Sequence, residues 1–305
     1  MTTTTTLLGG KEIHRMGLGA MQLAGPGVFG PPSDPGTART VLRRAIELGV
    51  DHIDTSQYYG PDVVNDLIRE ALYPYPDELK LATKVGWRRD EAGGILPAQR
   101  PYELREGVEA NLRSLRVDRL DLVYLRLISP EQAVALEDQL GELEDLHREG
   151  KLDLIGVSNV DQATLERALG QVDVASVQNA YNVLERDDDN LVAFARQHEI
   201  AFVPWALLGS SFRGPARLGA ERSIAEVADN HHATPTQIAL AWLLARYERM
   251  LLIPGTSSVA HLEQNVAALQ LELSDTDLAT LDHVGRRIRL TPCPAGSHGD
   301  APARG

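Results

Sequence analysis

The chain has 305 residues and a mass of 33.3 kDa, enough for one large domain or two small ones. Apolar residues make up 43% and charged residues 24%, which is typical of a folded globular protein and excludes collagen-like, coiled-coil and disordered chains. The 43 acidic residues outnumber the 30 basic ones, and the formal charge of −13 opposes binding to nucleic acid or to anionic lipid.

Two features indicate the compartment. The single cysteine, Cys293, cannot form a disulfide within the chain, so nothing points to an oxidising environment. The N-terminus lacks the pattern of a secretory signal, and no apolar run reaches the roughly 18 residues that cross a bilayer. We therefore expect a cytoplasmic protein without a membrane-spanning segment.

Short β-branched apolar runs alternate with longer amphipathic stretches, which indicates βα units on a parallel sheet. Eight strands are predicted, at Met16 to Ala20, Asp51 to Asp54, Lys80 to Val85, Asp121 to Leu125, Leu154 to Val157, Val174 to Gln178, Ala201 to Pro204 and Leu251 to Ile253. Helical patterns lie between them, at Thr37 to Leu48, Val63 to Leu72, Pro101 to Leu115, Pro130 to Glu149, Asp161 to Leu169, Ala220 to Asn230, Pro235 to Arg246 and Val259 to Leu269.

Eight strand–helix pairs in this length favour an α/β fold of the closed (β/α)₈ TIM-barrel type in a single domain. An open doubly wound sheet would carry a GxGxxG loop after its first strand, and none follows it here. The Gly- and Pro-rich stretch from Ala24 to Gly36 is predicted to be a loop over the barrel mouth. The barrel is expected to occupy residues 1–288, followed by a flexible tail at 289–305.

Polar residues follow the predicted second and third strands. Asp54 ends one strand, Tyr59 comes five residues later, and Lys84 ends the next. In a barrel such residues meet at the C-terminal face. An ammonium beside a phenol stabilises the phenolate, so we expect Lys84 to lower the pKa of Tyr59, with Asp54 holding Lys84 charged. The alternative is a structural Asp54–Lys84 ion pair with Tyr59 as an aromatic at the rim.

Five motifs carry a resemblance to a known family: DTSQYYG with Asp54 and Tyr59, the Lys84 strand, IGVSN at Ile155 to Asn159, VQNAYN at Val177 to Asn182 and IPGTSSVAHLEQN at Ile253 to Asn265. With them the chain resembles the aldo-keto reductase superfamily from Leu8 to about Arg287, and it looks most like the bacterial pyridoxal-reductase-type subgroup. The resemblance implies that hydride passes from a nicotinamide to a carbonyl carbon while Tyr59 protonates the oxygen.

One position departs from the family pattern. The family's usual histidine at the end of the fourth strand is Arg126 here. Arginine cannot hand over a proton, so our hypothesis is that Arg126 holds the carbonyl oxygen or an acidic substituent on the substrate. The alternative is that Arg126 points away from the mouth into a salt bridge.

The resemblance also implies the cofactor contacts. The residues expected to hold the nicotinamide are Ser158, Asn159 and Gln178 at its carboxamide and Trp205 against its ring. The residues expected at the phosphates are Leu208, Gly209 and Ser210, then Gly255, Thr256 and Ser257 at a helix start. Gln264 and Asn265 are expected at the adenine. Ser258 and His261 stand where NADPH-preferring relatives often place Lys and Arg, and we expect NADPH with NADH as the alternative.

The expected substrate is a small, flat aldehyde or ketone, because the predicted pocket residues are largely apolar: Met21, Phe29, Tyr58, Trp87 and Leu127. No metal site is expected, since His231 and His232 lack a ligand pattern and the run from Asp187 to Asp189 is expected to face solvent. A tailoring ketoreductase of a secondary-metabolite pathway and a non-catalytic nucleotide-sensing subunit remain as alternatives. A monomer or weak homo-oligomer is expected.

Overall fold

An antiparallel hairpin opens the part of the chain that the computed structural model describes, which is residues 3–127, 134–209 and 214–290. Its strands are β1 (Thr5–Leu8) and β2 (Lys11–His14), joined through Gly9 and Gly10, both with positive φ. The hairpin lies at the N-terminal ends of the barrel strands, where Lys11 pairs with Asp153 at 2.9 Å. The predicted elements did not include this hairpin.

Seven parallel strands follow in the hydrogen-bonded order in which the chain makes them. They are β3 (Leu18–Gly19), β4 (His52–Asp54), β5 (Lys80–Arg89), β7 (Leu120–Arg126), β8 (Leu152–Ser158), β9 (Val174–Ala180) and β10 (Ala201–Trp205). The predicted eighth strand is present as a segment bridged on both sides, through Met16 to Leu252 and through Phe202 to Met250. These bridges close the sheet, and the predicted single-domain (β/α)₈ barrel is confirmed.

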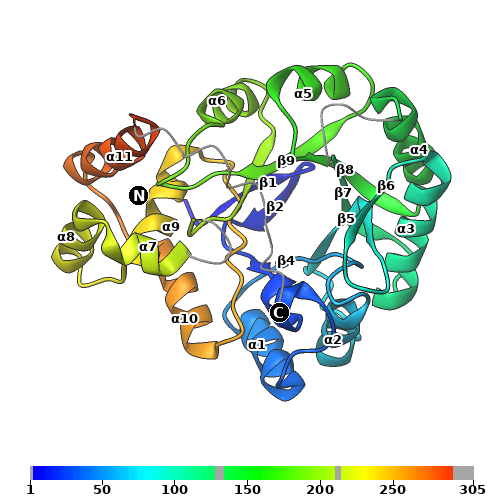
Figure 1. The fold of residues 1–305 in the computed structure, drawn as a ribbon, viewed down its shortest axis with the longest axis horizontal. Coiled ribbons are helices and arrows are strands. Elements are labelled where there is room, and N and C mark those ends of the chain that lie inside the picture. Colours follow the sequence, from blue (N-terminus) through cyan, green and yellow to red (C-terminus); the bar gives the residue numbers. More distant parts are fainter. Residues whose placement is uncertain (1–2, 128–133, 210–213, 291–305) are drawn as a thin grey trace, which may run out of the picture.

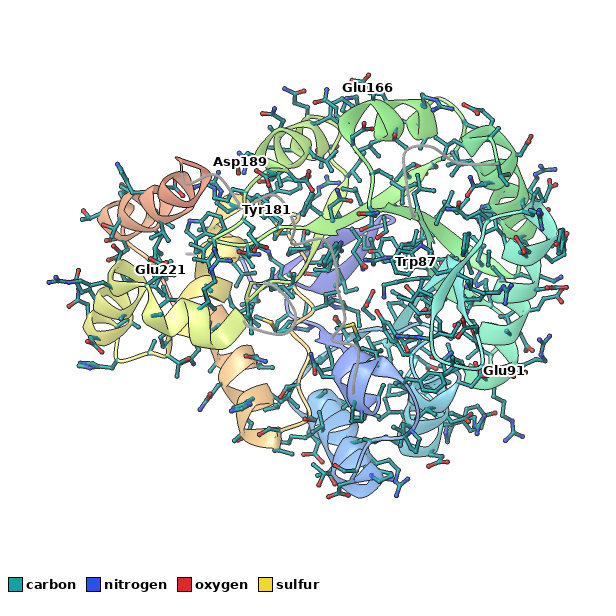
Figure 2. The ribbon with its side chains drawn as sticks, in the orientation of Figure 1. Trp87, Glu91, Glu166, Tyr181, Asp189 and Glu221 are labelled. Carbon is teal, nitrogen blue, oxygen red and sulfur yellow. The ribbon has the colours of Figure 1, made fainter. Side chains whose placement is uncertain are left out.

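Helices surround the strands in a ring (Figure 1). They are α1 (Pro35–Glu47), α2 (Val63–Leu72), α3 (Pro101–Leu115), α4 (Leu136–Arg148), α5 (Gln162–Leu169), α6 (Asp189–Gln197), α7 (Gly214–Ala220), α8 (Arg222–Asn230), α9 (Pro235–Arg246), α10 (Val259–Ala267) and α11 (Asp275–Leu290). Several carry an apolar stripe that packs inward and polar side chains that face outward, as the exposed Glu166 on α5 shows (Figure 2). Helix α9 is buried at every position from Ile238 to Leu244. No helix among the described residues is both long and apolar enough to span a membrane.

Local sequence signals set several helix ends. Asp34 caps α1 by accepting the backbone N–H of Thr37 at 3.0 Å, so this helix begins at Pro35 and not at the predicted Thr37. Asp161 caps α5 in the same way, so this helix begins at Gln162, one residue after its predicted start. Helix α4 begins at Leu136, later than predicted, and residues 130–133 of that prediction lie outside the described residues.

Three helices were absent from the prediction, namely α6, α7 and α11. Helix α11 continues to Leu290, two residues past the expected end of the barrel, and the rest of the predicted tail lies outside the described residues. Two short 3₁₀ helices, Ala20–Leu23 and Pro26–Val28, lie at and within the predicted mouth loop, and a third spans Ala268–Gln270.

The backbone is closely packed where the first and eighth barrel segments meet. Gly19 and Gly255 form a parallel bridge there. A Cβ added at Gly19 would lie 2.4 Å from the carbonyl oxygen of Ile253, so only glycine fits at this position. The same contact places Gly19 and Gly255 in the wall of the cavity at the barrel mouth.

Strand β5 is longer than predicted and rises above the barrel mouth. Its outer half pairs antiparallel with β6 (Ile95–Ala98), which places Trp87 and Arg89 beside the mouth. The Arg89 guanidinium donates to the carbonyl oxygens of Tyr58 at 3.3 Å, Gly27 at 3.2 Å and Gly93. Arg89 therefore ties the loop containing Gly27 to the β5–β6 hairpin.

Candidate active site

A cavity of about 600 Å³ opens at the C-terminal ends of the barrel strands. Such a volume is typical of small-molecule and cofactor sites. Its walls contain most of the residues predicted for the site: Met21, Asp54, Tyr58, Tyr59, Trp87, Arg126, Gln178, Trp205, Leu208, Gly209, Gly255, Thr256, Ser257 and His261. The barrel thus brings together side chains that are far apart in the sequence.

Asp54 and Lys84 form a buried ion pair at the base of this cavity. Lys84 Nζ donates to Asp54 Oδ1 at 2.5 Å and to the Thr55 carbonyl at 2.9 Å. The other carboxylate oxygen of Asp54 accepts from Gln178 Nε2 at 2.8 Å. Both charged side chains are almost fully buried, with 1% of Lys84 and 6% of Asp54 exposed. A buried pair of this kind is tolerated because each charge has partners, and removing either one leaves the other uncompensated.

Tyr59 lies against this pair. The Lys84 ammonium is 5.1 Å from the centroid of the Tyr59 ring, and Tyr58 packs edge-on against the same ring. Burial, and secondly the Asp54 carboxylate, raise the pKa of Tyr59 above its ordinary value, while Arg126 and Arg89 act in the opposite direction.

The predicted lowering of the Tyr59 pKa is therefore wrong for this structure. The Lys84 charge is taken up by Asp54 at 2.5 Å, and burial penalises the phenolate. Tyr59 consequently holds its proton throughout the neutral range, which is the protonation state that a proton donor needs.

Arg126 lies between two indole rings. Its Cζ is 4.9 Å from the centroid of Trp87 and 5.1 Å from that of Trp205. Nη1 makes one long hydrogen bond, 3.4 Å, to Ser158 Oγ, and Nε is buried without a partner. No carboxylate of the described residues lies within ion-pair distance of it, so the alternative of an outward salt bridge is wrong.

The wall opposite has groups that fit a nicotinamide dinucleotide. Gln178 Oε1 is buried without a partner, because Nε2 is committed to Asp54, and a carboxamide N–H could satisfy it. Thr256 and Ser257 line the cavity just before the N-terminus of α10, where the helix dipole favours anions. The residues present therefore fit this cofactor.

Other predicted residues lie outside the cavity walls. Ser158 is beneath Arg126, Ser258 caps α10, Gln264 is exposed, Asn265 is buried in α10, and Ser210 lies outside the described residues. The amide of Asn159 donates to the Leu127 carbonyl at 2.8 Å and borders a separate hollow.

The prediction was wrong for two residues expected in the substrate pocket. Leu127 borders the same separate hollow as Asn159, because it is the first residue beyond the end of β7. Phe29 is 37% exposed on the loop beyond Pro26–Val28, with its ring near Gly93. Neither side chain lines the cavity.

The prediction missed several residues of the cavity wall: Gly19, Gln22, Gly27, Val28, Arg89, Ile95, Ala206, Leu207, Ile253 and Pro254. Arg89 is the one with a detectable signal, since the pair Arg88–Arg89 directly follows an apolar strand. The predicted end of that strand at Val85 concealed it.

The acidic run also differs from expectation. Asp187 is exposed, but Asp188 accepts from Asn179 Nδ2 at 2.8 Å and Asp189 pairs with Arg186 at 3.1 Å. These contacts hold the start of α6 against the barrel. Within the described part of the chain, no group of three or more His, Cys, Asp or Glu side chains is placed to hold a metal ion.

Comparison with known proteins agrees with this geometry. Residues 15–286 match the Aldo/keto reductase family. The chain is 47% identical to pyridoxine 4-dehydrogenase of Escherichia coli (strain K12) over 291 residues, which cover 94% of this chain and all of that protein.

Two solved structures have the same fold. A thermostable aldo-keto reductase in complex with the inhibitor epalrestat has a TM-score of 0.79 at 30% identity, covering 92% of this chain and 99% of that one. An aldo-keto reductase from Klebsiella pneumoniae in complex with NADPH has a TM-score of 0.78 at 26% identity, covering 98% of each chain. The chain belongs to the aldo/keto reductase family and is an oxidoreductase that uses a nicotinamide cofactor.

Proposed function

We propose that this protein reduces the carbonyl group of a small, flat aldehyde or ketone with NADPH, and that a pyridoxal-like compound is among its substrates. The observation that carries the proposal is Tyr59, buried beside the Asp54–Lys84 pair in the wall of the cavity. The E. coli relative, named for oxidation of pyridoxine, supports the choice of substrate.

In this proposal Tyr59 is the general acid. When bound, NADPH supplies the hydride to the carbonyl carbon. Negative charge develops on the carbonyl oxygen, and the Tyr59 hydroxyl donates its proton to that oxygen. The phenolate that remains lies within the field of Arg126 and Arg89, whose positive charges lower the cost of this step.

Asp54 acts through Lys84 in this scheme. The 2.5 Å contact fixes the ammonium beside Tyr59 and gives its buried positive charge an opposite charge. The second oxygen of Asp54 fixes Gln178, whose free Oε1 is assigned to the nicotinamide carboxamide. One carboxylate thereby positions both the proton donor and the cofactor.

The cofactor wall would be formed by Trp205 and the backbone from Ala206 to Gly209 on one side. Gly255, Thr256 and Ser257 would face the phosphates on the other. We propose NADPH over NADH because hydroxyls and N–H groups near the start of α10 can hold a phosphate dianion, with His261 in the same wall.

Loss of NADPH absorbance on addition of pyridoxal and of a panel of aromatic aldehydes tests the proposal. Turnover of pyridoxal or of one of the aldehydes supports it. Cofactor binding without turnover of any carbonyl would instead favour a nucleotide-sensing protein. A titration in which NADH binds more tightly than NADPH would reverse the choice of cofactor.

A further inference from the structure

The strongest unexplained feature of the site is the charge on Arg126. Its guanidinium carbon lies about midway between two indole rings, at 4.9 Å and 5.1 Å, and no described carboxylate pairs with it. One N–H makes a 3.4 Å contact with Ser158, and Nε has no partner. Burying donors of a charged group without partners is costly, so the free donors indicate a ligand that supplies the acceptors.

The cavity as a whole has an excess of positive charge. Among the described residues, the only carboxylate in its wall is Asp54, which Lys84 neutralises. Arg89, also in the wall, donates only to backbone carbonyls. Two guanidinium charges therefore face this cavity in a chain whose formal charge is −13. A cleft with this charge concentrates anions of small size from solution.

The position of Arg126 separates it from the proposed phosphate wall. It ends β7 and touches Trp87 of β5, on the side of Tyr58 and Tyr59. The proposed phosphate positions, Gly255 to Ser257, are provided by the opposite part of the chain at the start of α10. The acceptor for Arg126 is thus not a phosphate of the cofactor, and an anionic acceptor is expected on the substrate.

The two indoles also restrain the guanidinium. Its Cζ lies within cation–π distance of both rings, and its one hydrogen bond among the described residues is the long contact from Nη1 to Ser158. A planar fork of this kind matches the two oxygens of a carboxylate or phosphate. We propose that Arg126 anchors an anionic oxygen substituent, a carboxylate or phosphate, on the carbonyl substrate, separate from the carbonyl oxygen at Tyr59. The inference rests on the proposed carbonyl reduction and narrows its substrates to anionic aldehydes and ketones.

A matched pair of substrates tests this. 4-Formylbenzoate and its methyl ester differ by one charge, and comparing both in the wild type and in Arg126→Gln cancels their intrinsic reactivity. We expect Arg126→Gln to lower kcat/KM for the acid about 100-fold more than for the ester, as expected for loss of a hydrogen-bonded charge contact. Arg126→Lys should restore part of the loss, because it keeps the charge without the fork.

The matched control is Arg116→Gln. Arg116 also lies over an aromatic ring, that of Tyr73 at 5.0 Å, but at the end of α3 and away from the cavity. Arg116→Gln should leave kcat/KM unchanged for both the acid and the ester. Turnover of the ester by Arg126→Gln shows that the variant is folded. An equal loss for acid and ester, or no loss for either, would overturn the inference.

Direct binding separates this inference from the proposed function. Calorimetric titration of 4-formylbenzoate into the protein saturated with NADP⁺ should show binding that Arg126→Gln abolishes. If that binding is found without turnover of any carbonyl, the inference stands and the proposed function fails. If neutral aldehydes are reduced but the anion does not bind, the proposed function stands and the inference fails.

A second pair distinguishes the two oxyanions. Pyridoxal 5′-phosphate and pyridoxal differ by a phosphate, so an Arg126-dependent preference within this pair identifies phosphate. The same preference within the formylbenzoate pair identifies carboxylate. Absence of an Arg126-dependent preference in both pairs overturns the inference.

Discussion

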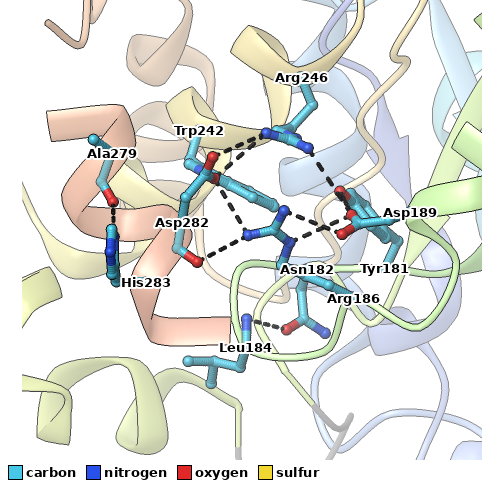
Figure 3. A network of polar contacts seen from close by, with 10 residues as sticks. All are labelled: Tyr181, Asn182, Leu184, Arg186, Asp189, Trp242, Arg246, Ala279, Asp282 and His283. Atoms are coloured by element: carbon cyan, nitrogen blue, oxygen red, sulfur yellow. Dashed lines mark hydrogen bonds and ion pairs between the residues drawn. The ribbon is translucent and has the colours of Figure 1, made fainter. Parts of the chain in front are cut away.

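Arginine stacks on tryptophan in two regions of this molecule, with opposite electrostatic settings. At the cavity, Arg126 lies between Trp87 and Trp205 without a carboxylate. In the second region, Arg186 and Arg246 both lie 5.2 Å from the Trp242 ring. Figure 3 shows that second region, which we call the Trp242 network.

In the Trp242 network both arginines form ion pairs with aspartates, although Arg246 Nε is buried without a hydrogen-bond partner among the described residues. Asp282 of α11 accepts from Trp242 Nε1 at 3.0 Å and from both arginines, and Asp189 pairs with Arg186 at 3.1 Å. The network joins the loop after β9 to α6, α9 and α11 (Figure 3). Arginine and tryptophan side chains thus join three helices in the Trp242 network, whereas at the cavity they leave the charge of Arg126 without a counter-charge. Stacking on tryptophan is common to both regions, so the feature that distinguishes a candidate binding site is the missing counter-charge.

The largest expected effect tests the chemistry of the cavity region. Tyr59→Phe removes the proposed proton donor while keeping the ring that packs on Tyr58. We expect kcat for aldehyde reduction to fall about 10³-fold, with NADPH affinity and thermal stability near wild type. Steady-state kinetics and fluorescence titration measure these quantities. Tyr102→Phe, at a tyrosine that is 55% exposed on α3, is the control. A fall in kcat of less than tenfold would show that Tyr59 is not the general acid.

The next effect tests the Trp242 network. Asp282→Ala leaves the indole N–H of Trp242 and one side of two guanidinium groups without an acceptor. We expect a loss of about 2 kcal/mol in the free energy of unfolding, measured by urea denaturation, with kcat unchanged. Asp229→Ala, at an exposed position on α8, should change stability by less than about 0.5 kcal/mol. Loss of activity without loss of stability would show that the network serves the reaction.

A third prediction concerns tyrosines and is the same for both regions. Burial raises the pKa of Tyr58 at the cavity and of Tyr181 in the Trp242 network, each to about 12. The unfolded chain, with a tyrosine pKa of about 10, loses these protons first. The contribution of these two tyrosines to the free energy of unfolding is therefore fully present below pH about 10. It declines as the pH rises toward about 12, and at pH 11 the loss is roughly 1 kcal/mol per tyrosine.

Denaturant melts between pH 8 and about 11 check this. Tyr58→Phe and Tyr181→Phe should each flatten the decline, whereas Tyr102→Phe should leave it as in the wild type. If the free energy of unfolding fell with pH to the same extent in all variants, the two buried tyrosines would titrate as exposed ones do.

The smallest expected effect is the change in stability on replacing Arg126, and comparing it with the replacement of Arg186 contrasts the two regions directly. Arg126→Gln removes two cation–π contacts but also relieves an uncompensated charge, so we expect a stability change within about 1 kcal/mol. Arg186→Gln removes a guanidinium that pairs with two aspartates and should cost more. Urea denaturation of both variants compares them. If Arg126→Gln cost as much as Arg186→Gln, Arg126 would be structural.

The barrel itself was largely predictable. Buried parallel strands are short apolar runs with strong turn and cap signals around them, and all eight segments were found within a few residues. The hairpin at the N-terminus was missed because its strands are only four residues long and mostly exposed or half-buried, with a single buried residue in each. Helix α6 was missed because its first residue belongs to an acidic run that looked solvated, whereas Asp189 meets Arg186 and Tyr181.

The site was predictable as a set of residues but not as a set of interactions. The rule that strand ends carry the chemistry selected Asp54, Tyr59, Lys84 and Arg126. It could not show that Asp54 takes up the Lys84 charge, which reverses the expected pKa shift of Tyr59. Nor could it show that Trp87, on an unpredicted extension of β5, covers the guanidinium of Arg126.

The junction between Gly19 and Gly255 has a consequence for synthesis of the protein. The pocket wall there combines one of the first segments to leave the ribosome with one of the last, and nearby Arg15 donates to the carbonyl of Met250 across 235 positions. A nascent chain that ends before residue 255 lacks the glycine that forms the bridge with Gly19. It also lacks the turn proposed to hold the phosphates. If this turn holds the phosphates as proposed, cofactor binding follows translation. Until then the edge of the first barrel strand stays open to pairing with other nascent chains.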